Sequence, residues 1–261
     1  MEFYNVSFAG AGRVAGALCK KMYQSGFCIQ QVVSRNELNG RQLSDSCKAQ
    51  WSRDLIFPPS TEIVIVAVPD NTLKNVLNTI KCGKETIVVH TAGSLGLDIF
   101  PAQIKRKGVF YPLQTFSKER NIEFKDLPFF LEASDILVNE TLKNLAEAIG
   151  GDVHFVDTGH RKILHLAAVF VNNFTNHMLT TGMDIAARSG FTFDLFGPLI
   201  KETISKAIDE GPANSQTGPA VRNDLNTIEK HLELLSFSSE SQNVYREITR
   251  SIINYYKGSD K

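Results

Sequence analysis

The 261-residue sequence lacks net charge, long apolar runs and a leader-like N-terminus. Its 28 Lys and Arg residues balance 28 Asp and Glu residues, so bulk electrostatic attraction to nucleic acid is not expected. No uninterrupted apolar stretch approaches the roughly 18 residues that a membrane-spanning helix needs, and "MEFYN" contains no basic segment that leads into an apolar one. We therefore expect a cytoplasmic protein that binds a small molecule, with no nucleic-acid or membrane partner.

Closely spaced cysteine pairs are also missing from the sequence. Cys19, Cys28, Cys47 and Cys82 form no Cys-x-x-Cys motif, and the chain is long enough to build a core without disulfides. Reduced thiols scattered through the core are expected. No metal site is predicted.

What the sequence does contain is an alternation of short apolar runs and helical stretches up to about residue 155. This alternation is typical of a mostly parallel sheet covered by helices. The run "IVIVAV" at 63–68 is apolar at every position, which predicts a central strand buried on both faces. The predicted strands are 4–9, 29–34, 62–68, 85–90, 108–111, 128–132 and 153–156.

After Asp157 the pattern becomes helical. The predicted helices are 161–179, 193–208, 224–235 and 242–256. We therefore predict an α/β domain over residues 1–156, followed by an all-helical domain over residues 157–261.

A glycine cluster in "FAGAGRVAGAL" lies between the first predicted strand and a run of helix formers. Gly10 permits a sharp turn, Gly12 allows close approach of a pyrophosphate, and Ala15 lets the helix pack tightly on the sheet. The bare motif is weak, but its place between strand and helix fits a dinucleotide site, where helix amides face the anion. Cofactor contacts are expected from Gly10, Gly12, Arg13, Val14 and Ala15.

The second predicted strand ends in "VVSRN", where an NAD site normally has Asp or Glu. Ser34 and Arg35 carry no negative charge to repel a 2′-phosphate, and the guanidinium of Arg35 suits one. NADP is therefore favoured over NAD as the cofactor. A solvated surface role for Arg35, and an S-adenosylmethionine site at the same glycine turn, are the alternatives.

Ligands of open α/β sheets lie beyond the carboxyl ends of the strands. Three loops follow such ends: "VPDNT", "HTAGS" and "YPLQTF". His90, which ends an apolar strand, is either a structural or a catalytic histidine. Cofactor contacts are expected from Val68, Pro69, Asp70, Thr91 and Gly93, and a substrate contact from Ser94.

The segments "FAGAGRVA", "VVSR", "VIVAVPD", "VVHTAGS", "GVFYPLQTF" and "TGPAVRNDLNTIEKHLELL" resemble, in order, a family that joins a Rossmann-like domain to a helical domain of unassigned function. That family is similar to pyrroline-5-carboxylate reductase, ketopantoate reductase and the 3-hydroxyacid dehydrogenases. The resemblance implies NAD(P) binding and a homodimer formed through the helical domain. Related members have His where this chain has Tyr111.

The predicted helix 161–179 is apolar nearly all round in its middle, which predicts burial, yet polar residues recur along it. Lys162, His165, Asn172, Asn173 and Asn176 are spaced to lie near one face. The related reductases carry a catalytic lysine on this helix, and the resemblance puts His165 in its place. The catalytic candidates are therefore His165, Asn173 and Lys162, and the rival interpretation is a dimer interface in which these groups bond one another.

The loop "TGPAVRND" precedes the predicted helix 224–235, with Asp224 or Asn223 as its cap. Thr217 and Arg222 are candidate ligands of an acidic substrate. Together these features predict an NADP-dependent oxidoreductase that reduces a C=O or C=N bond. A non-catalytic NADP-binding sensor or scaffold and a methyltransferase are the alternatives.

Overall fold

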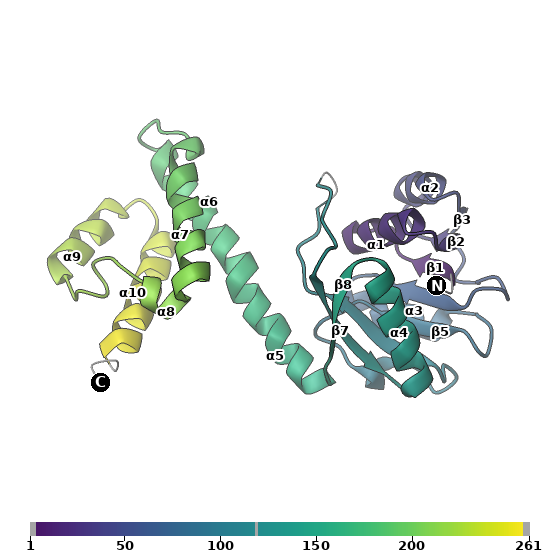
Figure 1. Ribbon diagram of the computed structural model, residues 1–261. Helices are drawn as coiled ribbons and strands as arrows, with labels where there is room; N and C mark the ends of the chain where they lie inside the picture. The colour runs from purple at the N-terminus through teal and green to yellow at the C-terminus, as the bar shows by residue number, and fades with distance from the viewer. Residues whose placement is uncertain (1–3, 118–119, 258–261) are drawn as a thin grey trace. The chain divides into compact units, whose positions relative to one another are not determined.

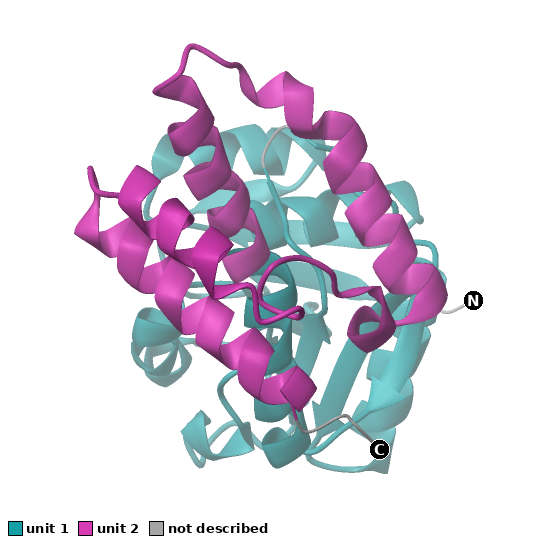
Figure 2. Cartoon of the chain, turned by 90° about the vertical axis from the view of Figure 1, so that its left-hand side faces the viewer, with its two compact units in different colours: residues 1–173 teal, residues 174–261 magenta. Residues whose placement is uncertain are grey.

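The computed structural model describes residues 4–117 and 120–257. The chain forms two compact units, residues 1–173 and 174–261 (Figure 2). The division falls inside one long helical segment, because the first part of that segment contacts the sheet. The domain boundary expected between residues 156 and 157 stays a prediction.

The first unit is built on one eight-stranded sheet (Figure 1). Its strands are β1 (Asn5–Ala9), β2 (Cys28–Val33), β3 (Gln50–Ser52), β4 (Ile63–Val66), β5 (Ile87–His90), β6 (Lys107–Pro112), β7 (Leu127–Ala133) and β8 (Gly151–Phe155). They lie in the order β3-β2-β1-β4-β5-β6-β7-β8, and only the β6–β7 pair is antiparallel. The carboxyl ends of β1 to β6 therefore meet at one edge of the sheet.

Strand β4 is the central strand that its sequence predicts. All four of its side chains are buried, with no residue more than 1% exposed. Ile63 and Ile65 join the core on one face, while Val64 and Val66 join the core on the other. Full burial of such side chains stabilises the fold by about 1.5–3 kcal/mol each.

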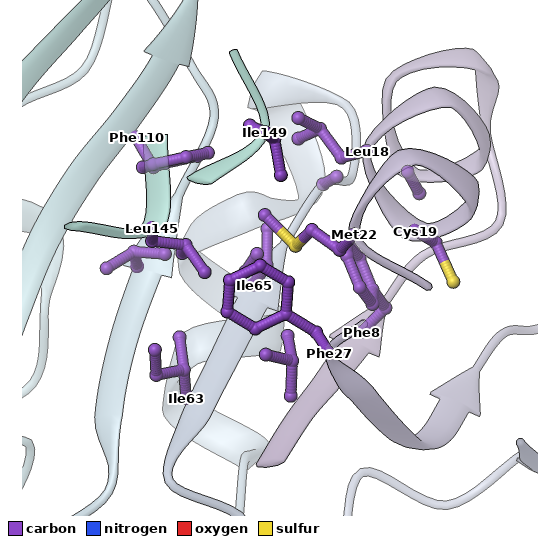
Figure 3. Packing of buried hydrophobic residues seen from close by; sticks show 14 of the residues in the cluster. Phe8, Leu18, Cys19, Met22, Phe27, Ile63, Ile65, Phe110, Leu145 and Ile149 are labelled. Carbon is purple, nitrogen blue, oxygen red and sulfur yellow. The ribbon is translucent and has the colours of Figure 1, made fainter. Parts of the chain in front are cut away.

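Helices cover both faces of the sheet in the first unit. They are α1 (Arg13–Gln24), α2 (Glu37–Ser46), α3 (Asp70–Thr79), the short η1 (Leu97–Ile99) and α4 (Ile136–Ala148). The helix α5 (Thr158–Ala168) follows β8, and Arg161 is the residue of this helix that is buried. On one face Leu18 and Met22 of α1 pack near Phe8 (Figure 3). On the other face Leu73 and Leu77 of α3 are buried. The fold class predicted for the first part of the chain is confirmed.

All seven predicted strands are present, and β3 is the strand that the sequence prediction missed. Its three residues, "QWS", are too few and too polar to show a strand pattern. The cysteine prediction holds for Cys19 and Cys47, which are buried, but Cys28 is exposed on β2.

The predicted helix 161–179 differs from expectation in two ways. Residues Val169–Phe174 form a π-helical turn, η2, between α5 and α6 (Thr175–Ala187), so α-helical spacing fails across it. Its apolar side chains are also exposed: Leu166 is 58% exposed and Val171 76% exposed. The prediction that the middle of this helix is buried was therefore wrong for the single chain.

The second unit is helical, as predicted. Its elements are α6, η3 (Phe193–Phe196), α7 (Gly197–Glu210), α8 (Pro212–Ser215), α9 (Leu225–Leu234) and α10 (Ser239–Lys257). Asp224 caps α9 by accepting a hydrogen bond from the Thr227 amide at 3.1 Å, which confirms one of the two predicted caps. Among the described residues, no helix combines the length and apolar character needed to span a bilayer.

Candidate functional site

The glycine turn lies between β1 and α1, as the sequence predicts. Gly10 has φ +117°, and a Cβ there would lie 2.2 Å from the carbonyl oxygen of Ala67. Its amide donates to the Val33 carbonyl at 2.8 Å, which ties the turn to β2. Only glycine combines this backbone conformation with this close approach.

Gly12 has open space around it. Among the described residues, a Cβ on Gly12 would meet nothing within 4 Å, and no side chain caps the start of α1. The first amides of this helix therefore face open space at the positive end of the helix dipole. An anionic group such as a pyrophosphate fits this position.

A cleft of about 770 Å³ opens at the glycine turn. This volume lies within the range of ligand pockets. The predicted cofactor residues that line it are Gly10, Gly12, Ser34, Arg35, Val68 and Pro69. The predicted residues therefore meet at one cleft although they come from three parts of the sequence.

The cleft holds a second arginine that the sequence analysis missed. Arg53 follows β3 and lines the cleft together with Arg35. The carboxylate of Glu37 lies 3.6 Å from Arg53 and 2.9 Å from Arg41, so its charge is balanced there. The two guanidinium groups of Arg35 and Arg53 suit a 2′-phosphate. The sequence analysis missed Arg53 because β3, the strand before it, has only a weak strand pattern.

The other predicted residues of the turn have different surroundings. Arg13 lines a neighbouring cavity of about 540 Å³, which Gly12 also lines. Ala15 is fully buried, and Val14 packs against the same core. Ala15 therefore packs the helix against the sheet, as its small size predicts. Contacts of Arg13, Val14 and Ala15 with a cofactor stay predictions.

A second group of polar side chains gathers where β5 and β6 end. The hydroxyl of Tyr111 on β6 lies 2.9 Å from Nδ1 of His165 on α5. Gly93 lies directly against both rings, because a Cβ there would be 2.7 Å from His165 Nδ1 and 2.9 Å from Tyr111 Cζ. His165, Tyr111 and Gly93 thus form a packed cluster, which we call the Tyr-His cluster.

Asp70 and Ser94 connect this cluster to the cleft. Asp70 begins α3 directly after Pro69, and its carboxylate accepts a hydrogen bond from the Ser94 hydroxyl at 2.5 Å. Burial raises the pKa of Tyr111, and the charge of Asp70 raises it further. The amide of Thr91 donates to the Val66 carbonyl at 3.3 Å, so this amide is not available to a ligand.

His90 is a structural histidine in this fold. It is fully buried at the end of β5, where Nδ1 accepts the Ala92 amide at 3.1 Å and Nε2 lies 3.4 Å from the Gly96 carbonyl oxygen. Burial lowers its pKa to about 4, so the ring is neutral at neutral pH. Its role is to shape the loop that carries Thr91, Gly93 and Ser94.

Arg161 holds the helix of His165 in place, a role that the sequence did not reveal. Its side chain is fully buried in the first turn of α5. The guanidinium forms an ion pair with Glu132 on β7 and donates to the Leu95 carbonyl at 2.5 Å. Arg161 therefore joins α5, β7 and the loop after β5.

Two family models match the chain. Residues 5–93 match "NADP oxidoreductase coenzyme F420-dependent", and residues 127–252 match a domain of unknown function, DUF2520. A putative NADP oxidoreductase from Bacteroides fragilis is 38% identical over 97% of this chain and 98% of that chain, with a TM-score of 0.89. The chain belongs to this family of NADP oxidoreductases. NADP, the cofactor predicted from Ser34 and Arg35, is named in the description of the matched family model and in that of the Bacteroides fragilis protein.

More distant structures share the fold of this NADP oxidoreductase. A Thermotoga maritima protein is 24% identical over 98% of this chain and 100% of that chain, with a TM-score of 0.71. A reductive aminase from Aspergillus terreus, in complex with NADPH and ethyl-5-oxohexanoate, is 13% identical over 99% of this chain and 94% of that chain, with a TM-score of 0.68. No curated protein matches the sequence.

Four further predicted residues lie on α5, in η2 and in the second unit. Lys162 is exposed on α5, and Asn173 is exposed within η2. Thr217 and Arg222 belong to the second unit, where Thr217 lines an apolar cavity of about 330 Å³. The catalytic and substrate-binding roles of these four residues stay predictions.

Proposed function

We propose that this NADP oxidoreductase reduces a C=O or C=N bond of a small substrate at the Tyr-His cluster. A continuous set of contacts supports the proposal. Pro69 lines the cleft, Asp70 follows it and bonds Ser94, and the neighbouring Gly93 touches both His165 and Tyr111. A nucleotide held at the glycine turn can therefore extend toward the cluster.

The residues divide into binding and chemical roles. Gly12 and the α1 amides would hold the pyrophosphate, while Arg35 and Arg53 would hold the 2′-phosphate. When bound, NADPH supplies a hydride to the electrophilic carbon. His165, beside Gly93 and Tyr111, is placed to stabilise or protonate the atom on which charge develops, because an imidazole N–H can donate to that atom.

The test begins with calorimetric titrations of NADPH, NADH and S-adenosylmethionine. We expect NADPH to bind more tightly than NADH, and the double variant R35A/R53A to remove most of that preference. NADPH oxidation is then followed across panels of carbonyls and imines. Tight NADPH binding with no turnover would favour the sensor alternative, and binding of S-adenosylmethionine alone would favour the methyltransferase.

The substrate is proposed to carry a carboxylate that Arg222 and Thr217 bind, and the active form is proposed to be a homodimer. The exposed apolar side chains of α5 and η2, including Leu166 and Val171, support the dimer. Large exposed apolar side chains that are concentrated on one helical segment normally mark an interface. Titration with short mono- and dicarboxylic keto acids, before and after Arg222→Ala, tests the carboxylate proposal.

A further inference from the structure

The Tyr-His cluster holds a phenol in hydrogen-bond contact with an imidazole. Tyr111 and His165 are 54 positions apart, and their rings meet edge to face with centroids 5.8 Å apart. We infer that Tyr111 and His165 form a proton relay, with Tyr111 donating to Nδ1 and Nε2–H presented to the substrate, and that the substrate group is a carbonyl. The inference rests on the proposed function and names its substrate class.

The direction of the hydrogen bond follows from the two groups. A phenol is a stronger donor than acceptor, and an unprotonated imidazole nitrogen is a good acceptor. Burial and the charge of Asp70 both raise the pKa of Tyr111, so its hydroxyl keeps its proton at neutral pH. In neutral His165 the ring proton then lies on Nε2.

The other ring nitrogen of His165 is available for a ligand. Within residues 4–117 and 120–257, Nε2 has no hydrogen-bond partner, and it is not among the buried polar atoms left unpaired. Nε2–H can therefore reach a substrate oxygen, while Nδ1 stays bonded to Tyr111. Of the two nitrogens, only Nε2 is free for chemistry.

Gly93 is independent support for the pair. Its φ does not lie in the left-handed region, so the backbone conformation does not require glycine. The lack of space does require glycine, because a Cβ on residue 93 would lie 2.7 Å from Nδ1 of His165, the atom that is hydrogen-bonded to Tyr111. The residue type at position 93 thus makes room for the Tyr111–His165 contact.

The relay has a balanced reaction. Hydride addition to the carbonyl carbon forms a C–H bond and moves the C=O π pair onto oxygen. That oxygen takes the proton from His165 Nε2, while Nδ1 takes the proton from the Tyr111 hydroxyl, which leaves a neutral ring of the other tautomer. Nδ1 then returns its proton to the tyrosinate, and Nε2 takes a proton from water, which restores the starting tautomer. The transfer is downhill, because an alkoxide is a stronger base than a phenolate.

An iminium substrate would not need this relay. It already carries its positive charge before hydride addition, and the product is a neutral amine. A buried phenol with a raised pKa is too weak an acid to protonate an imine beforehand. The pair therefore favours a carbonyl as the group reduced.

The first test does not depend on turnover. Nitrogen-15 NMR of the histidine rings at pH 8, with His165 assigned through the variant H165Q, reports which nitrogen carries the proton. We expect the Nε2–H tautomer in the wild type and a mixture of tautomers in Y111F and G93A. A predominant Nδ1–H tautomer, or no change in Y111F, would overturn the relay.

The second test compares substrate classes. We expect NADPH oxidation with carbonyls, a loss of roughly 100-fold or more in kcat for Y111F, and an unchanged KM for NADPH. Reduction of an N-methylated iminium ion, which needs no proton, should be spared in Y111F. Turnover of imines alone would overturn the carbonyl assignment. Failure of the wild type to bind NADPH in calorimetry, or NADPH binding with turnover of neither class, would instead overturn the proposed function.

Discussion

At the scale of single residues, Gly10 and Gly12 are glycines for opposite reasons. Gly10 has a backbone conformation and a contact with Ala67 that a side chain would disrupt. Gly12 has free space around its Cβ position, so the protein alone does not require glycine there. We attribute the glycine at position 12 to the bound nucleotide, whose pyrophosphate needs close access to the α1 amides.

Substitution of Gly12 by Ala should therefore weaken NADPH binding without unfolding the protein. A Cβ at this position would push a phosphate away from the α1 amides, and the loss of one hydrogen bond to a charged group costs about 1.5–3 kcal/mol. This corresponds to a fall in affinity of roughly ten- to hundredfold by calorimetry. The melting temperature should fall only slightly, because Gly12 is the N-cap of α1 and alanine is a poorer N-cap than glycine.

Gly16→Ala is the matched control for this substitution. Gly16 also has nothing within 4 Å of its Cβ position, but it lies inside α1 and away from the cleft. We expect NADPH affinity to be unchanged in this variant. Equal losses in both variants would show that Gly12 acts through the helix and not through a phosphate.

At the scale of elements, buried groups fix the loop after β5 against α5. His90 forms hydrogen bonds inside the loop, and Arg161 donates to the Leu95 carbonyl from α5. Removing one member of such a buried set leaves its partners unsatisfied, which is costly. The position of His165 therefore depends on side chains that contact no ligand.

His90 should make the protein less stable as the pH falls. Because its pKa is about 4 in the folded state and 6.5 in the unfolded chain, the unfolded state binds more protons between these values. The free energy of unfolding should fall from pH 6.5 downward, by roughly 2 kcal/mol at pH 5. Urea unfolding at pH 7.5 and pH 5 measures this difference.

His90→Asn provides the comparison, since the amide oxygen can still accept the Ala92 amide but does not titrate. The change in unfolding free energy between the two pH values should be smaller in this variant by roughly the 2 kcal/mol that His90 contributes. A pH dependence identical to that of the wild type would show that another group titrates.

At the scale of the whole molecule, the chain leaves apolar surface uncovered on α5 and η2. Leu166→Asp should convert a dimer to a monomer in sedimentation equilibrium, because it places a charge in the proposed interface. Leu38→Asp is the control, since Leu38 is 78% exposed on α2, far along the chain from this face. A monomeric wild type, or dissociation in the Leu38 variant as well, would refute the interface.

Features that depend on neighbouring residues could be predicted from the sequence. The glycine turn, the buried strand β4 and the cap at Asp224 each depend on a few consecutive side chains. The direction of the cofactor preference followed from Ser34 and Arg35 for the same reason. Arg53 was missed because its short strand β3 is identified only by its pairing with β2.

The sequence by itself determined the alternation of strands and helices, the place of the nucleotide turn and the change to a helical second part, because local periodicity and backbone preference decide them. Only the tertiary structure decided that Tyr111 meets His165 and that Arg161 meets Leu95, contacts that span 54 and 66 positions. Such pairs form when separate strands and helices pack, and no local pattern records which side chains will then be neighbours.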